Sequence, residues 1–287
     1  MNEKILIPDK NRFEKIKENI KKGGFENLSV FTDFDRTLTY GTVRGKKTPS
    51  MIAVLRVNND YLGKDYSKKA LLLLEKYEPI EFDFNIDEKE KRKAMEEWWR
   101  EHINLLVEKK LNKKHFKKIV DERSVSFRDN TKAVFNLLKK HDVPMIIISA
   151  SGLGEEPISM MIKKELGDFP NTYIISNSFY YDKDGNITGY KDFLIHTMNK
   201  DEVLLKERNF YEKIRDRKNL ILLGDSFDDV KMANNIDYEN IIKVCFLTQY
   251  TMEKIDDYKK LYDVLILNDS SMDFVKELLL EIENFKR

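Results

Sequence analysis

The chain has 287 residues, of which 41% are hydrophobic and 35% charged, enough apolar material for one large domain or two modest ones. Its 51 basic residues balance its 50 acidic residues, so no overall field favours nucleic acid or an anionic membrane. No apolar run reaches membrane-spanning length, and the N-terminus lacks a signal-peptide core. Because the single cysteine, Cys245, excludes an internal disulfide, we expect a cytoplasmic protein. We further expect a monomer that binds neither nucleic acid nor membrane.

The first predicted elements are a helix over about residues 10–22, which a Gly-Gly pair ends, and a buried strand over about residues 28–32. The pattern then changes, and between residues 41 and 123 we expect helices and no strand. Asp87 suits the N-cap of a long helix whose apolar residues recur at helical spacing. This region is predicted to be a helical insert that covers the end of the first strand.

Helices and buried strands alternate over the rest of the chain. Continuous apolar strands that alternate with helices are typical of a parallel sheet covered on both faces. The predicted elements are a helix at 130–140, a strand at 144–149, a helix around 158–166, a strand at 173–176, a hairpin turning at Asp184-Gly185, a helix at 200–214, strands near 220–223, 241 and 264, and a helix after Met272.

The predicted fold is therefore α/β, with a doubly wound, mostly parallel sheet and an inserted helical cap domain. We assign residues 1–40 and 124–287 to the α/β core. We assign residues 41–123 to the cap.

Acidic residues follow two of the predicted strands. Asp33 and Asp35 end the first strand, and Asp225, Asp228 and Asp229 follow the strand near 220–223. The carboxyl ends of parallel strands meet at the crevice where ligands bind in open α/β folds. Converging carboxylates repel one another unless a cation lies among them, and oxygen ligands favour Mg²⁺. The sequence therefore predicts a magnesium site at this edge of the sheet.

Asp33 has the chemistry of a nucleophile toward phosphorus. A free carboxylate is ionised at neutral pH and needs no base to activate it, so attack on a phosphate would give an aspartyl-phosphate. Asp35 could protonate the leaving oxygen and later deprotonate water, which requires a pKa raised by burial or crowding. We expect the Thr37 hydroxyl to brace the loop.

Two other segments are suited to holding phosphate oxygens. Ser149 ends a buried strand and precedes the small residues 150–154, so its hydroxyl and free backbone N–H groups could cradle an anion. Lys200 lies at a predicted helix start, where its charge and the helix dipole both favour anions.

In combination, these motifs resemble the haloacid dehalogenase-like phosphatase superfamily, whose pattern is Asp-x-Asp-x-Thr, a strand ending in Ser or Thr, a Lys, and Gly-Asp-x-x-x-Asp. Over roughly residues 10–270 the resemblance narrows to cytosolic 5′-nucleotidase type III, the pyrimidine 5′-nucleotidase family. The residues that carry it are Lys22-Gly23-Gly24, Asp33-Phe34-Asp35-Arg36-Thr37-Leu38-Thr39, Glu75-Lys76-Tyr77, Ile80-Glu81, Ser149-Ala150, Leu194-Ile195-His196, Asn199-Lys200 and Leu222-Leu223-Gly224-Asp225-Ser226.

The resemblance implies a magnesium-dependent 5′-nucleotidase that hydrolyses pyrimidine nucleoside monophosphates, or 7-methylguanosine monophosphate, through an aspartyl-phosphate. It also implies the role of each matching residue. Asp33 would be the nucleophile and a metal ligand, and Asp35 would be the acid/base that also gives its backbone carbonyl to the metal. Asp225 would be a further metal ligand, and Asp229 would orient a water on the metal. The phosphate would be bound by Ser149, Ala150 and Lys200, and the base would lie near Glu81 and His102.

Some residues depart from the family pattern or leave alternatives open. Arg36 stands where methionine is familiar, and we expect it to point away from the metal. The segment 149–154 has one extra residue, and His102 stands where a small polar residue is expected, so it could face the pocket or the surface. Asp228 is either a second water-orienting acid or a helix N-terminal charge, and the latter is favoured.

Two other functions remain open at this stage. One is a phosphatase of another small metabolite such as phosphoserine, against which the long cap and Glu81 argue. The other is a non-catalytic phosphate-binding protein on the same fold, against which the full set of acidic residues argues.

Overall fold

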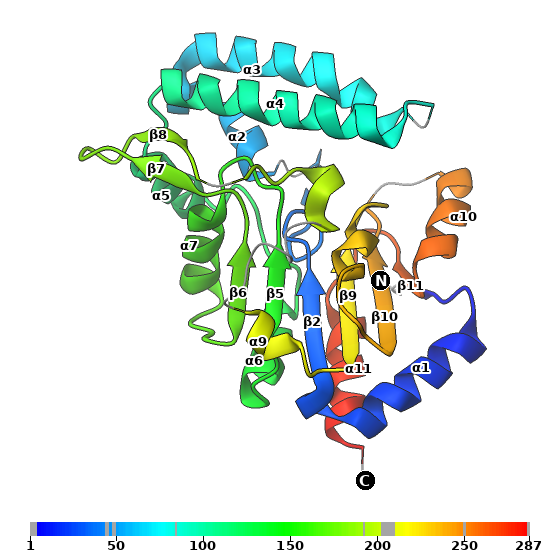
Figure 1. The fold of residues 1–287 in the computed structure, drawn as a ribbon. Helices are drawn as coiled ribbons and strands as arrows, with labels where there is room; N and C mark the ends of the chain where they lie inside the picture. The colour runs from blue at the N-terminus through cyan, green and yellow to red at the C-terminus, as the bar shows by residue number, and fades with distance from the viewer. Residues whose placement is uncertain are drawn as a thin grey trace.

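The computed structural model describes residues 5–43, 46–47, 50–83, 85–191, 193–201, 210–248 and 251–285. A central sheet is flanked by helices, and a pair of long helices lies across the end of the sheet where its parallel strands terminate (Figure 1). This arrangement confirms the predicted α/β fold with a mostly parallel sheet.

The main sheet has seven strands in the order β1-β11-β10-β9-β2-β5-β6, with β2 between β9 and β5. Every neighbouring pair is parallel except β1 with β11, which is antiparallel. The strands are β1 (Ile5–Leu6), β2 (Leu28–Thr32), β5 (Met145–Ile148), β6 (Thr172–Ile175), β9 (Asn219–Gly224), β10 (Asn240–Phe246) and β11 (Val264–Ile266). The strand order reverses at β2, and this is the position where open α/β sheets bind ligands.

Both faces of the sheet are covered because successive side chains along a strand point to opposite faces. Val30 packs into one buried cluster, with residues of α1 (Lys10–Gly23), α6 (Thr131–Lys140), α7 (Glu155–Glu165) and α11 (Asp273–Glu283). Phe31 packs into the other, with residues of α9 (Tyr211–Ile214), η3 (Asp229–Ala233) and α10 (Met252–Leu261). The continuous apolar strands of the sequence are thus explained by burial on two sides.

The predicted insert contains the helices α2 (Met51–Val57), α3 (Asn59–Phe82), α4 (Glu88–Glu108) and α5 (Lys113–Asp121), which we call the cap helices. Asp87 caps α4 as expected, since its side chain accepts a hydrogen bond from the Lys89 N–H. The expectation of no strand was wrong in one detail. The two-residue strands β3 (Thr42–Val43) and β4 (Lys46–Lys47) pair at the start of the insert, and strands this short leave no periodic signal in a sequence.

The remaining predictions of local structure are confirmed in part. The hairpin consists of β7 (Phe179–Tyr181) and β8 (Ile187–Tyr190), and it turns at Gly185, whose φ is +81°. The short helices η1 (Phe25–Asn27) and η2 (Thr197–Asn199) were not predicted, nor was α10. The middle of the predicted helix at 200–214 lies outside the described residues.

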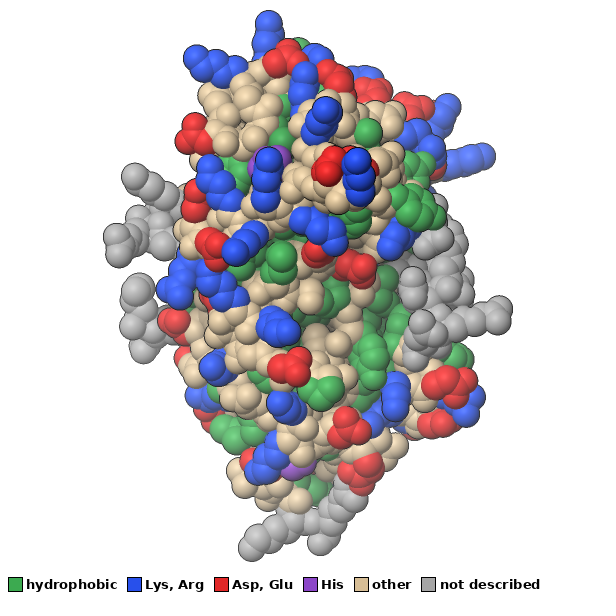
Figure 2. All heavy atoms as spheres, turned by 90° about the vertical axis from the view of Figure 1, so that its left-hand side faces the viewer, with side chains coloured by type: hydrophobic (Ala, Val, Ile, Leu, Met, Phe, Trp, Pro, Cys, Tyr) green, Lys and Arg blue, Asp and Glu red, His purple; other side chains and the backbone are tan. Residues whose placement is uncertain are grey.

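The division into a core of residues 1–40 and 124–287 and a cap of residues 41–123 stays a prediction. Within the described ranges, no helix is both long enough and apolar enough to cross a bilayer. Basic and acidic side chains are interspersed over the face drawn in Figure 2, as the near-zero net charge leads one to expect.

Ile221 should be a sensitive position for stability, because it lies fully buried in β9 between its partners Val30 and Ile242. We expect Ile221→Ala to lower the free energy of unfolding by about 2–5 kcal/mol, through lost burial and the cavity left behind. Urea denaturation measures the change. Leu72→Ala, at a side chain that is 55% exposed on α3, is the control and should change stability by less than about 0.5 kcal/mol. Equal losses in the two variants would contradict the assignment of β9 to the core.

Candidate active site

Three neighbouring strands deliver predicted site residues to one edge of the sheet. Asp33 follows β2, Ser149 follows β5 and Asp225 follows β9. The Asp33 N–H donates to the carbonyl of Leu223, 3.1 Å away, so the β2–β9 ladder continues up to the first acidic residue. Residues nearly two hundred positions apart in the sequence are therefore placed side by side by strand pairing.

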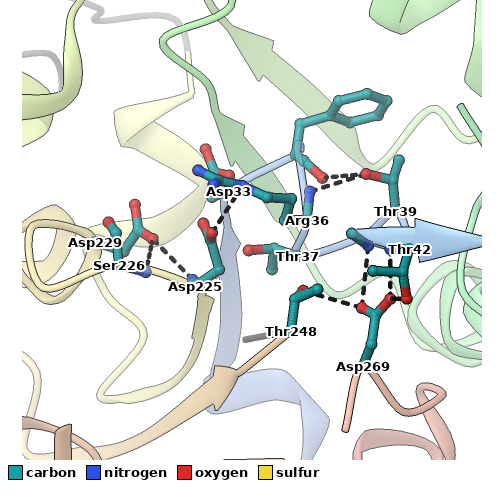
Figure 3. Close-up of polar contacts among 12 residues, drawn as sticks. Asp33, Arg36, Thr37, Thr39, Thr42, Asp225, Ser226, Asp229, Thr248 and Asp269 are labelled. Carbon is teal, nitrogen blue, oxygen red and sulfur yellow. Dashed lines mark hydrogen bonds and ion pairs between the residues drawn. The ribbon is translucent and has the colours of Figure 1, made fainter. Parts of the chain in front are cut away.

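Asp33, Asp225 and Asp229 form an acidic cluster. One carboxylate oxygen from each lies within 4.8 Å of the others. Figure 3 shows the three side chains facing one another, Asp33 from the end of β2 and the other two from the segment after β9. The structure thus brings together three of the four residues that were predicted for the metal site, and Asp35 is not in this cluster.

Lys200 bridges two members of this cluster. Its ammonium group donates to Asp33 Oδ1 at 2.6 Å and to Asp229 Oδ1 at 2.7 Å. Burial works against the lysine charge, but the two carboxylates outweigh it and raise the pKa of Lys200. Lys200 is therefore a fixed positive charge beside Asp33.

Asp229 holds the segment after β9 in shape. Its Oδ2 accepts the backbone N–H groups of Asp225 and Ser226 at 2.9 and 3.0 Å. Although burial favours its neutral form, Lys200 and these two N–H groups lower the pKa of Asp229. Gly224 allows this approach, because a Cβ there would lie 2.5 Å from the Asp229 Cβ.

The other two carboxylates are less easily ionised. Burial is the main cause that raises the pKa of Asp33 to about 7 and that of Asp225 to about 6, and neighbouring aspartates add to it. A site that resists negative charge in this way is stabilised by a cation, and its donors are all oxygens. The cluster therefore fits a hard divalent cation.

Arg36 does not lie as predicted. It was expected to point away from the metal site, but its Nε lies 3.1 Å from Asp225 Oδ2 (Figure 3). The reason is local: Arg36 has a φ of +63°, so the chain leaves the extended conformation in which alternate side chains point to opposite sides. Attraction to Asp225 then favours the inward orientation.

Asp35 lies outside the acidic cluster, but it has the raised pKa that a proton carrier requires. Burial, and then the charge of Asp33, raise its pKa to about 7. Its Oδ1 is buried and has no hydrogen-bond partner among the described residues. The carboxyl group is therefore positioned to change protonation state near neutral pH.

The prediction for Thr37 was wrong. The Thr37 hydroxyl is buried without a hydrogen-bond partner in the described part of the chain. Thr39 braces the loop instead, since its hydroxyl accepts the Arg36 N–H at 2.9 Å and donates to the Phe34 carbonyl at 3.5 Å. The motif pattern alone did not show which of the two threonines braces the loop.

The segment after β5 lies directly beneath the cap. Ser149 is buried, and its hydroxyl accepts the Ser151 N–H at 3.2 Å, while Ala150 is half-buried. A Cβ at Gly152 would lie 2.6 Å from the Trp99 ring, so only glycine allows this ring of α4 to pack here. Helix α4 of the predicted cap and the predicted phosphate-binding segment are thus in contact.

The two predicted base-binding residues differ in accessibility. Glu81 is half-buried near the end of α3, and burial raises its pKa against the opposing effects of a Thr197 hydrogen bond and the Arg36 charge. His102 is fully buried, with Nε2 3.1 Å from the Tyr66 hydroxyl and its ring stacked on Trp99. A direct contact of His102 with a base stays a prediction that this packing does not favour.

Sequence reasoning gave no role to Arg128 and Asp269. Arg128 is fully buried and donates to the backbone carbonyls of Arg36 and Thr37 at 2.6 and 2.8 Å. A lone arginine outside any motif carries no distinguishing signal. The prediction for Asp228 holds, since it precedes the short helix η3 and pairs with Lys231 at 2.8 Å.

The fold and this acidic edge define a phosphatase-type hydrolase with the haloacid dehalogenase-like fold. The sequence model of the Pyrimidine 5′-nucleotidase (UMPH-1) family matches residues 36–283. The chain belongs to this family of phosphoric monoester hydrolases.

Individual relatives agree with this assignment. The chain is 33% identical over 283 residues to the 7-methylguanosine phosphate-specific 5′-nucleotidase of Homo sapiens, covering 98% of this chain and 93% of the relative. It is 34% identical to the enzyme of the same name from Gallus gallus, covering 96% and 94%. The crystal structure of cytosolic 5′-nucleotidase IIIB bound to cytidine is similar, with a TM-score of 0.85 at 26% identity over 97% of this chain and 93% of that one.

A phosphoserine phosphatase structure shares the fold at a TM-score of 0.51 and 18% identity, covering 88% of this chain and 97% of that one. At this identity the similarity concerns the fold alone.

The raised pKa of Asp35 has a consequence for stability. Above the unfolded value of about 3.8 the folded state resists ionisation, so Asp35 costs stability as the pH rises, up to its folded pKa of about 7. In EDTA, Asp35→Asn should match the parent near pH 4 and exceed it at pH 8 by up to about 4 kcal/mol. Urea unfolding across this pH range measures the difference. Asp216→Asn, at an exposed aspartate, is the control; a difference that does not change with pH would contradict the raised pKa.

Proposed function

We propose that the chain is a magnesium-dependent 5′-nucleotidase that hydrolyses nucleoside 5′-monophosphates through an aspartyl-phosphate. The observation that carries the proposal is the position of Asp33, at the end of the central strand, bonded to Lys200 and within reach of Asp225 and Asp229. A nucleophile, a fixed cation and a cation-binding cluster thus lie within one buried site.

Magnesium is the cation that suits this donor set. The side chains of Asp33 and Asp225 and the backbone carbonyl of Asp35 would hold it, and Asp229, whose carboxylate is the third member of the cluster, would orient a water on the metal. The three carboxylate oxygens lie within 4.8 Å of one another, which is close to the roughly 4.2 Å across an ideal Mg²⁺ octahedron. The ion would neutralise charge on the phosphoryl group.

The remaining residues handle the phosphoryl group. A carboxylate oxygen of Asp33 attacks phosphorus, and the bond from phosphorus to the nucleoside 5′-oxygen breaks. Lys200 stabilises the transferring oxygens, while the Ser149 hydroxyl and the Ala150 N–H hold them from the β5 side. Water then attacks the aspartyl-phosphate and releases inorganic phosphate.

Asp35 moves the proton in both half-reactions. With a pKa of about 7, its protonated and ionised forms are both populated at neutral pH. The acid form protonates the departing 5′-oxygen, and the resulting carboxylate takes a proton from the attacking water.

The base would be read in the cap. A Glu81 carboxylate accepts hydrogen bonds from the exocyclic amine of cytosine or from the N–H groups of 7-methylguanine, whereas uracil has a carbonyl acceptor in place of the cytosine amine. The family name and the relatives' names concern pyrimidine and 7-methylguanosine nucleotides, which is consistent with this assignment. Nucleotide would enter between a core of residues 1–40 and 124–287 and a cap of residues 41–123.

A monomeric, cytoplasmic enzyme that binds neither nucleic acid nor membrane belongs to the same proposal. The nearly neutral net charge and the single buried cysteine support it.

A substrate panel tests the proposed reaction. With Mg²⁺, we expect kcat/KM for cytidine and 7-methylguanosine monophosphates to exceed that for uridine monophosphate by about tenfold or more, because uracil offers Glu81 a carbonyl where cytosine offers an amine. Phosphate release measures it. Phosphoserine should be a poor substrate, and a preference for it would favour a different small-metabolite phosphatase.

Asp33→Asn is the matched control for this panel. It should abolish phosphate release while the unfolding transition stays cooperative, since an amide lacks the charge of the nucleophile. Substantial activity in this variant would contradict the role of Asp33. Binding of phosphate without turnover in the parent would favour a non-catalytic protein.

Metal binding can be measured without turnover. After EDTA treatment, adding Mg²⁺ to about 100 times its Kd should stabilise the protein by about 2.7 kcal/mol, or roughly 5 °C in Tm. Asp225→Asn should lose most of this shift because it removes one ligand, whereas Asp216→Asn should retain it. An equal shift in both variants would place the ion elsewhere.

A further inference from the structure

Two segments connect the proposed cap to the core, and they lie side by side. The first linker is residues 40–43, and the second linker is residues 124–128. The Tyr40 N–H donates to the Ser126 carbonyl at 2.9 Å, and the Arg128 N–H donates to the Leu38 carbonyl at 2.9 Å. Thr39 and Phe127 form an antiparallel bridge between these bonds. Any change in the direction of one linker therefore affects the other.

Asp269 binds the first linker. Its Oδ1 accepts the Gly41 N–H at 3.0 Å, and its Oδ2 accepts the Thr42 N–H and hydroxyl at 2.6 and 2.8 Å (Figure 3). Thr248, after β10, donates its hydroxyl to Oδ1 at 3.1 Å. Burial alone would raise the pKa of Asp269, but these donors and Arg128 lower it, so the group is a carboxylate.

Arg128 binds the second linker to the catalytic loop. Besides its bonds to the carbonyls of Arg36 and Thr37, it donates to the Ser270 carbonyl at 2.5 Å and pairs with Asp269 at 2.9 Å. Its guanidinium also lies over the Phe246 ring, 4.6 Å from the centroid. The same side chain therefore contacts the loop that carries Asp35 and the residue that holds the first linker.

The shape of the Asp269 turn is itself unusual. Asn268 and Asp269 both have positive φ, +63° and +52°, a conformation that costs free energy in non-glycine residues. This turn directs the Asp269 carboxylate at the first linker, where five donors meet it. A costly backbone conformation of this kind persists only where many surrounding contacts hold it in place.

We propose that Arg128 and Asp269 form a linker clasp, a pair of positioning residues that sets the direction of both cap linkers and fixes it relative to the Asp33–Thr37 loop. The clasp lets the cap close over a nucleotide while the catalytic loop stays in place. This inference rests on the proposed nucleotidase function, because it assigns the cap a role in nucleotide binding.

Asp269→Asn tests the clasp selectively. The amide oxygen can remain at the Oδ1 position, paired with Arg128, but the amide NH₂ then faces the Thr42 N–H, so two donors oppose each other. The first linker should therefore be loosened at Thr42, although the Gly41 N–H keeps its acceptor, and the catalytic loop should be kept in place. Thr248→Val is the control, because it removes a donor to the same carboxylate but no hydrogen bond to either linker. Valine is nearly the same size as threonine, so the packing of this side chain against Gly41 is kept.

The first readout is hydrogen–deuterium exchange. In Asp269→Asn, amides in the first linker should exchange at least tenfold faster, while β2 and β9 change by less than threefold. Thr248→Val should leave the first linker protected. Unchanged protection of this linker, or a uniform increase through β2 and β9, would overturn the proposal.

The second readout compares two substrates. Cytidine monophosphate needs cap contacts, whereas 4-nitrophenyl phosphate needs only the catalytic loop. Asp269→Asn should lower kcat/KM for the nucleotide at least tenfold and for the aryl phosphate less than threefold. Equal losses would indicate a general structural role and overturn the clasp.

A second variant keeps the test decisive if Asp269→Asn does not fold. Thr42→Val removes only the hydroxyl donor to Oδ2 and should shift both readouts in the same direction by about threefold; no shift would overturn the clasp. If the parent hydrolyses the aryl phosphate but no nucleotide, the proposed function fails, and hydrogen exchange alone then decides the clasp.

Discussion

The site depends on charge compensation by Lys200. Its ammonium group lies between Asp33 and Asp229, and all three side chains are almost wholly buried. Removing one partner from a buried ionic group leaves an uncompensated charge, which is far more costly than losing a surface pair. The same bridge positions Asp33, the proposed nucleophile, and fixes Asp229, whose other oxygen accepts the backbone N–H of Asp225. Catalytic geometry and local stability therefore depend on one set of contacts.

Contacts between the cap helices and the core lie close to this site. Lys231 pairs with Glu88 of α4 at 2.9 Å, and Arg92 of the same helix pairs with Asp201 at 3.1 Å. Both pairs are partly exposed, so each contributes little free energy and can break and re-form. Permanent positioning comes instead from buried groups such as the clasp. This division would suit the proposed cap, which would open for substrate and close again in the same orientation.

The sequence predicted the sheet well because buried parallel strands are long apolar runs, and β2 and β9 fall where the pattern placed them. It also identified the members of the acidic cluster, since strand ends and residue spacing carry that information. The orientation of Arg36 was missed because it depends on a positive φ that no motif encodes. Arg128 and Asp269 were missed because their roles arise from contacts between segments far apart in the chain. Short strands such as β3 are too brief to leave a pattern.

The contact between Gly152 and Trp99 has an evolutionary consequence. The indole of α4 occupies the space that any side chain at position 152 would need, and the nearest approach would be 2.6 Å. One residue belongs to the loop beneath the cap and the other to the cap itself, so neither can change size independently. Homologues with a larger residue at position 152 should carry a smaller one at position 99. Covariation between these two positions would then show that the segment after β5 and helix α4 have evolved together.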